Sequence, residues 1–202
     1  LAWGGDPRAF DWFESPLPER IDRAFDLLGR LGATRDGRLS SAGRYIQRLP
    51  LHPRLSAILL AAGGAREAAI ACAVLSERHY YAQQREYSQQ REYSRQGEQP
   101  QPSGHRATTT SDLLSIAESQ RDLPQSLRRT AETLRLLAGE IAAPVPQPLG
   151  EVAFNRAILA GYPDRVARRR EPGSPRVLLS SGHGAVVGSE SGVRDGEFLV
   201  AL

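Results

Sequence analysis

The residues best suited to bind a ligand are arginines that gather near the C-terminal end of the sequence. Within residues 165–176 the acidic residue is Glu171, and the basic residues are Arg165, Arg168, Arg169, Arg170 and Arg176. A local excess of positive charge concentrates phosphate-bearing partners even where, as here, the whole chain carries a net charge of only +3. The alternative interpretation is a solvated basic turn without a ligand.

The composition of the basic residues also limits the chemistry, because all 26 of them are arginine. A phosphate-binding loop of the type G-x-x-x-x-G-K-S/T needs a lysine, as do Schiff-base and lysine general-base mechanisms. The histidines have no metal-ligand spacing, and SSGHG at 180–184 lacks both a nucleophile-elbow pattern and an acid partner. We therefore expect no ATPase site, no catalytic residue and no metal site in this chain.

The overall composition is that of a chain able to fold around a hydrophobic core. The sequence has 202 residues, 40% of them hydrophobic, which suits one or two domains. No apolar run approaches the roughly 18 to 20 residues of a membrane span, so we expect no membrane-spanning segment. Cys72 is the sole cysteine, which favours a reducing compartment and a cytoplasmic location. The sequence lacks methionine, so we interpret it as a fragment of a longer polypeptide.

The first fifty residues predict a helix, a hairpin and a second helix. Apolar residues recur at helical spacing over residues 19–31. Asp36-Gly37 is typical of a tight turn between two short segments, and Ser40 suits the cap of the second helix. This order of elements predicts a winged-helix-like unit in residues 1–50.

The stretch LPLHPRL, residues 49–55, predicts a stiff corner in the chain. Residues before a proline avoid the helical region, and Pro53 suits the first turn of a new helix. His52 lies at the apex of the corner. We interpret it as a structural residue that hydrogen-bonds its neighbours, in preference to a ligand or catalytic role.

Two segments of contrasting composition follow. Residues 65–75 are small and apolar, which predicts a tightly packed internal helix in which Cys72 is an inert core residue. Residues 79–110 contain no aliphatic side chain larger than alanine and carry the tandem hexapeptide QQREYS, so we interpret them as an exposed polar insertion. The alternative is that the tyrosines and arginines of the insertion stack on exposed bases.

The remaining patterns predict a mainly α fold with a β-containing end. Helical patterns return in residues 111–143, so residues 51–145 predict a small helical bundle that carries the insertion. The prolines of APVPQPLG then form a stiff linker, and residues 151–160 are helix-like. Short strand patterns follow at residues 177–179, 185–187 and 198–202. Residues 146–202 are thus expected to hold a helix and the start of a truncated β-domain.

Several of these motifs together resemble one family. They are FDWFESPLPERIDRAFDLLGRLGA, DGRLSSAGRYIQRLPLHPRLSAILLAA, ACAVLSER and AILAGYPDRVARRR. They are similar to the region that follows the two motor domains in bacterial DEAH-type ATP-dependent helicases of the HrpB group. The order and separation of LPLHPRL and YPDRVARRR make the resemblance specific, and it covers nearly the whole chain outside residues 79–110.

The resemblance implies an architecture and a role. It implies a winged helix in residues 1–50, a helicase-associated (ratchet) bundle in residues 51–145 and the start of an OB-like domain in residues 146–202. In such enzymes these parts form one wall of the channel that holds single-stranded nucleic acid, RNA or DNA. ATP and magnesium would then bind the upstream motor domains of the parent enzyme, and this fragment would hold no cofactor of its own.

The resemblance also implies particular contacts. The matched motif PDRVARRR offers Arg165, Arg168, Arg169 and Arg170 as contacts to backbone phosphates, since each guanidinium can fork onto phosphate oxygens. Arg54, just after the proline corner, is a second candidate. The cluster lacks base-reading amides, so we expect it to bind nucleic acid without sequence preference.

Two other classes of function stay open. A stand-alone winged-helix regulator that binds DNA would also be basic, but the second helix offers few base-reading side chains, namely Arg44, Gln47 and Arg48. A protein-interaction scaffold is the other class, since winged-helix units of the family also bind activating partners. An enzyme in its own right is the class that the sequence favours least.

Overall fold

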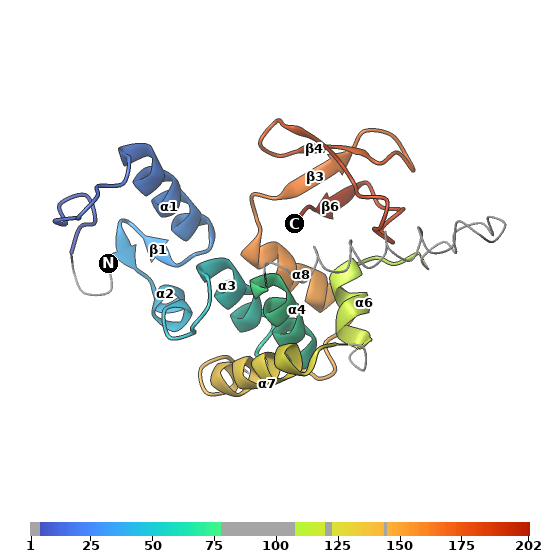
Figure 1. Ribbon diagram of the computed structural model, residues 1–202, viewed down its shortest axis with the longest axis horizontal. Coiled ribbons are helices and arrows are strands. Elements are labelled where there is room, and N and C mark those ends of the chain that lie inside the picture. The colour runs from blue at the N-terminus through green and yellow to red at the C-terminus, as the bar shows by residue number, and fades with distance from the viewer. Residues whose placement is uncertain (1–4, 78–107, 120–122, 144) are drawn as a thin grey trace, which may run out of the picture.

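A computed structural model describes residues 5–77, 108–119, 123–143 and 145–202 of the chain (Figure 1). The helices are α1 (Pro18–Arg30), α2 (Ser41–Ile46), α3 (Pro53–Ala61), α4 (Arg66–Ser76), α6 (Asp112–Glu118), α7 (Gln125–Gly139) and α8 (Glu151–Gly161). The strands are β1 (Thr34–Arg35), β2 (Arg38–Leu39), β3 (Val166–Arg169), β4 (Arg176–Leu179), β5 (Gly184–Val186) and β6 (Phe198–Val200). The fold is therefore mainly α with small antiparallel sheets, as expected. The predicted insertion at residues 79–110, with its QQREYS repeat, lies outside the described residues except for residues 108–110.

The N-terminal unit consists of α1, the β1–β2 hairpin and α2. Asp36 and Gly37 have φ values of 51° and 71°, the left-handed pair that a two-residue hairpin turn requires. Ser40 caps α2, because its Oγ accepts a hydrogen bond of 2.9 Å from the Gly43 N–H. The apolar pattern of residues 19–31 predicts that Ile21 and Leu28 lie in the core, and this prediction is wrong in degree. Both are only partly buried, since α1 packs against a small hairpin and one small apolar cluster.

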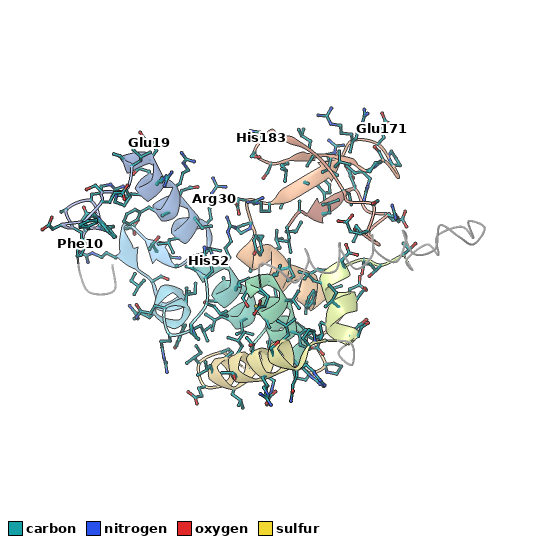
Figure 2. The ribbon with its side chains drawn as sticks, in the orientation of Figure 1. Phe10, Glu19, Arg30, His52, Glu171 and His183 are labelled. Atoms are coloured by element: carbon teal, nitrogen blue, oxygen red, sulfur yellow. The ribbon has the colours of Figure 1, made fainter. Side chains whose placement is uncertain are left out.

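The corner at residues 49–55 is built as the sequence predicts. His52 is the N-cap of α3, and its Nδ1 accepts a hydrogen bond of 3.3 Å from the Arg54 N–H. Pro53 occupies the first turn, where a missing N–H costs nothing. His52 therefore has the structural role expected of it. Figure 2 shows it at the junction between the N-terminal unit and the central helices.

The main core lies among the central helices. α3 packs against α8 and α4, and α4 packs against α7 and α6. The largest buried side chains there include Phe154, Ile58, Leu59 and Val74. Cys72 lies in the same core, where its thiol donates to Leu55 O at 3.3 Å and burial raises its pKa to about 12. A thiol that stays protonated at neutral pH is a poor nucleophile, so Cys72 is inert as predicted.

The close packing of α3 on α8 depends on Gly161. A Cβ placed on Gly161 would lie 2.6 Å from Arg54 O and would also overlap the Ile58 side chain. Because the obstructing atoms include backbone, a larger residue can be accommodated only if the two helices separate. The small residue thus sets the distance between α3 and α8.

The four-stranded sheet has the order β5-β4-β3-β6, and every pair of neighbours is antiparallel. Strands β4, β5 and β6 match the predicted strand patterns within two residues at each end. β3 was not predicted, although it is a central strand that contains part of the arginine run. Its sequence VARR has no simple alternation of apolar and polar residues, so the period-two signal is missing.

We expect Gly161→Ala to lower the free energy of unfolding by about 1 to 3 kcal/mol, because the added methyl group clashes with the α3 backbone. Gly139→Ala is the matched control, since a Cβ on that α7 residue meets no atom within 4 Å. The control should leave stability unchanged or raise it slightly. Urea denaturation followed by circular dichroism measures both, and equal stability of the two variants would contradict the account of the α3–α8 contact.

Candidate nucleic-acid interface

The arginine run forms a strand, so its side chains alternate between the two faces of the sheet. Ala167 and Arg169 point inward and are buried, whereas Arg168 and Arg170 are exposed. Arg165 precedes β3 and is exposed as well. The structure therefore separates the predicted phosphate contacts into outward and inward members.

Arg169 is the inward member, with 6% of its surface exposed. Its Nε donates to Gly196 O at 3.1 Å, and its Nη2 donates to Val193 O at 3.2 Å. Nη1 donates to Ser174 O. The guanidinium thus joins the turn after β3 to the long loop before β6, and each of its three nitrogens donates to a backbone carbonyl. This geometry favours a structural role for Arg169 over the phosphate contact that the sequence implied.

The same loop is fixed at a second point by α6. The Asp112 carboxylate accepts hydrogen bonds from Ser191 Oγ at 2.6 Å and from the Gly192 N–H at 2.8 Å. Thr109 N also donates to Gly192 O at 3.0 Å. Residues 188–197 are therefore anchored both to the helices and to β3, and this sets the position of β6 beside β3.

Arg168 is the central exposed cation of β3. Its Nε donates to Glu197 Oε1 at 2.9 Å, and the two side chains are 68% and 59% exposed. An ion pair in such contact with water contributes little to stability, so a phosphate can replace the carboxylate at small cost. Arg168 therefore remains available to an anionic ligand.

Two further arginines extend the positive charge on this side of the sheet. A Cβ placed on Gly184 of β5 would lie 3.7 Å from Arg170 Nη2, so the Arg170 guanidinium reaches across the face towards β5. Arg176 is exposed in β4, in register with Val186. Among the described residues, the side chains of Arg165, Arg170 and Arg176 have no hydrogen-bond or ion-pair partner. Glu171 lies in the turn between β3 and β4, at the outer end of the sheet (Figure 2).

Apolar side chains lie between these arginines. Leu178 and Phe198 flank Arg168 in the register of the neighbouring strands, and Val186 follows in β5. All three are exposed, Phe198 to 62%. We call this surface the outer face; its members are Arg168, Arg170, Arg176, Leu178, Val186 and Phe198. The sequence did not reveal that Phe198 lies beside Arg168 or that Arg176 lies opposite Arg170, because both positions depend on β3 lying between β4 and β6.

Arg54 lies apart from the outer face, in an internal ion pair. Its Nη1 and Nη2 donate to the two carboxylate oxygens of Asp164 at 2.5 and 2.8 Å, and Nη1 also donates to Gly161 O at 3.1 Å. Its guanidinium lies 5.0 Å from the centre of the Tyr162 ring. With 14% of its side chain exposed, Arg54 joins α3 to the turn before β3, which favours a structural role over the phosphate contact that the sequence implied.

This ion pair changes the acid–base properties of its neighbourhood. The hydrogen bonds from Arg54 lower the pKa of the Asp164 carboxyl, and burial opposes that effect. The same hydrogen bonds raise the pKa of Arg54. Burial, followed by the charge of Arg54, lowers the pKa of His52. The pair is therefore charged at neutral pH while His52 is neutral, as its role as a hydrogen-bond acceptor requires.

Neither a metal-holding cluster nor a membrane-spanning helix is found in the described part of the chain. In residues 5–77, 108–119, 123–143 and 145–202, no group of three or more histidine, cysteine or acidic side chains is placed to hold a metal ion. Within the same part of the chain, no helix has the length and apolar character needed to cross a membrane.

Comparison with known proteins identifies the relatives of this arrangement. No protein-family model matches the chain. ATP-dependent RNA helicase HrpB of Escherichia coli strain K12 is 28% identical over 204 residues, which cover 100% of this chain and 21% of that protein. The crystal structure of the E. coli DExH-box NTPase HrpB matches 98% of this chain with a TM-score of 0.68 and 25% identity, over 21% of that chain.

The chain is therefore similar in sequence and in fold to one part of HrpB. A second crystal structure, of the E. coli DEAH/RHA helicase HrpB, shares the fold, with a TM-score of 0.65 and 24% identity over 98% of this chain and 22% of that one. The chain thus spans about a fifth of the length of the HrpB proteins it matches. The resemblance read from LPLHPRL and YPDRVARRR is confirmed, and the structure adds that these two motifs meet through Arg54 and Asp164.

We expect Asp164→Asn to lower the free energy of unfolding by about 2 kcal/mol at pH 7, because the buried side of Arg54 loses its charged partner. Since the pKa of Asp164 is lowered in the folded state, its stabilisation is present above the usual value of 3.8 and is lost as the pH falls through the folded-state value. The variant should therefore lose stability less steeply below pH 3.8. Urea denaturation at a series of pH values measures this.

His52 supplies an internal control for that experiment. Its folded-state pKa is lowered, so both proteins should lose stability as the pH falls below 6.5, the usual value of histidine. Identical curves for the two proteins across the whole range would contradict the role assigned to the Arg54–Asp164 pair.

We expect Arg169→Ala to lower the free energy of unfolding by about 3 kcal/mol, because three carbonyl groups lose their donors inside the fold. Arg168→Ala is the matched control on the same strand and should change stability by no more than about 0.5 kcal/mol. Thermal unfolding of both variants tests whether Arg169 is structural and Arg168 is not. Equal losses of stability would show that the inward and outward arginines are not distinguished as described.

Proposed function

We propose that this chain is an accessory part of an ATP-dependent helicase and guides single-stranded nucleic acid along its surface. The observation that carries the proposal is the outer face, where arginines of adjacent strands surround exposed apolar side chains. The similarity to HrpB supports the parentage. Because that relative is named an RNA helicase, we propose RNA as the ligand class.

The proposed architecture follows the order of elements. Residues 1–50, with a helix, a hairpin and a helix, are assigned to a winged-helix unit. Residues 51–145 are assigned to the helicase-associated (ratchet) bundle, and residues 146–202 to an OB-like β-domain that α8 precedes. In the whole protein, motor domains upstream of this region would bind ATP and magnesium and would move the strand. The buried free cysteine is consistent with a cytoplasmic location.

The proposed contacts combine charge with stacking. Arg168, Arg170 and Arg176 bind backbone phosphates, and the exposed Arg165, just before β3, adds positive charge nearby. Phe198 offers a flat apolar surface on which a base can stack, and stacking tolerates any sequence. Binding of this kind requires exposed bases, so the face suits a single strand better than a duplex.

Two arginines that the resemblance implied as phosphate contacts, Arg54 and Arg169, are not among the contacts proposed here. Arg54 and Arg169 have their guanidinium groups occupied by internal partners, so we assign them structural roles. Their substitution would weaken nucleic-acid binding only through loss of folding. The test below therefore uses the exposed arginines.

We expect Arg168→Ala/Arg170→Ala/Arg176→Ala, which removes the three arginines of the outer face, to bind single-stranded RNA about tenfold more weakly than the unchanged chain, and equally so for different sequences. Three lost phosphate contacts should also reduce the slope of log affinity against log salt by about 2. Fluorescence anisotropy with labelled RNA at several salt concentrations measures both quantities.

The matched control is Arg20→Ala/Arg129→Ala/Arg156→Ala, which removes the same charge from exposed positions on α1, α7 and α8. Equal affinity of the two triple variants would contradict the assignment of the outer face. A loss confined to duplex DNA of one sequence would favour the regulator interpretation instead.

A further inference from the structure

A second positively charged concavity lies in the N-terminal unit. An open cavity of about 800 Å³ is bounded by the β1–β2 hairpin and α2. Its lining includes Arg35, Arg38 and Arg44, while the acidic residue in the lining is Asp36. We call this cavity the hairpin groove. It carries an excess of positive charge, and it shares no residue with the outer face.

The arginines of the hairpin groove are free to bind a ligand. Arg35, Arg38 and Arg44 are exposed, and none has a side-chain hydrogen bond or ion pair within the described part of the chain. Arg8 and Arg30 of the N-terminal unit, by contrast, pair with Asp22 and Asp26. The groove thus gathers cations that the fold does not itself neutralise.

The backbone beneath these side chains is held firmly. Ser40 Oγ donates to Gly32 O at 2.5 Å and accepts from the Gly43 N–H, which fixes the hairpin to the start of α2. Ser40 N donates to Ala33 O at 3.0 Å on the other side of the same junction. Gly43 allows this approach, since a Cβ there would lie 2.7 Å from Leu39 Cδ1. The backbone that carries the three arginines is therefore preorganised, which lowers the cost of binding.

We propose that the hairpin groove is a second phosphate-binding site for single-stranded nucleic acid. Guanidinium groups fork onto phosphate oxygens, and three of them around one concavity match the repeated charges of a nucleic-acid backbone. The lining contains no asparagine, glutamine or aromatic residue, so the groove offers neither an amide to read adenine nor a ring for base stacking, and its arginines make the contacts. The identity of the ligand rests on the proposed function, whereas the site is independent of the outer face.

The position of the groove predicts how the two sites act together. Figure 1 shows the hairpin to the left of the central helices and the four-stranded sheet above α8, so the two lie apart. A short strand would contact one of these sites, and a long strand would contact both. Linking two contacts through one strand raises affinity without any new interaction.

The test compares Arg35→Ala/Arg38→Ala/Arg44→Ala with the charge-matched control Arg20→Ala/Arg129→Ala/Arg156→Ala. Each variant of the full chain is titrated by anisotropy with oligouridylates of about 8 and about 40 nucleotides, lengths chosen against the roughly 4 to 16 nucleotides that one binding fold covers. We expect the groove variant to bind the long RNA about tenfold more weakly than the control, with a salt slope lower by about 2. Its preference for long over short RNA should also shrink.

The outer-face variant, measured in parallel, separates the two proposals. If the groove variant equals the control while the outer-face variant is weakened, the groove is overturned and the proposed function stands. If the groove variant alone is weakened, the groove is supported and the outer face is not. Absence of RNA binding by the unchanged chain overturns both. If labelled polyglutamate shows the same groove-dependent binding as RNA, the assignment to phosphates is overturned in favour of an acidic protein partner.

Discussion

The bidentate ion pair between Arg54 and Asp164 joins the first turn of α3 to the turn that precedes β3, and the placement of the β-sheet follows from it. The two residues are 110 positions apart in the chain. The contact forms because Gly161 lets α8 approach the α3 backbone, and because His52 and Pro53 direct Arg54 towards that approach. β3 begins two residues after Asp164, so its direction depends on this junction.

From that junction, the pleat of β3 distributes the arginines between two tasks. Arg169 turns inward and holds the loops around the sheet, while Arg168 and Arg170 turn outward. Successive arginines of one strand thus hold the neighbouring loops in place and form an exposed positive surface. The stability of the loops and the charge of the surface are therefore physically coupled, although different side chains carry them.

The sequence predicts the local elements well and the long-range contacts poorly. Helical periodicity located the helices, and Asp36-Gly37, Ser40 and the proline corner located the turn and the caps, because these signals act over a few residues. β3 was not predicted because its sequence, VARR, shows no alternation of apolar and polar residues. The inward turn of Arg169, the partner of Arg54 and the position of Phe198 beside Arg168 all depend on pairing between distant segments, which no local pattern reports.

At the candidate site, too, the sequence predicts the local feature and misses the long-range contacts. The arginine run was visible as a charge cluster, but whether a given arginine faces water or carbonyl groups is decided by register and loop anchoring, including the Asp112 contact to residues 191–192. The resemblance to HrpB-group helicases agrees with the relative that the comparison found, and it offered these arginines as equal candidates. The structure separates them by burial and by hydrogen bonding.

The most direct test of the central claim is a titration of the unchanged chain with labelled single-stranded RNA, single-stranded DNA and duplex DNA at low and physiological salt. A surface of arginines and one exposed aromatic ring predicts binding that tolerates any sequence, prefers single strands and weakens steeply as salt rises. Binding that prefers one duplex sequence, or that is insensitive to salt, would contradict the account.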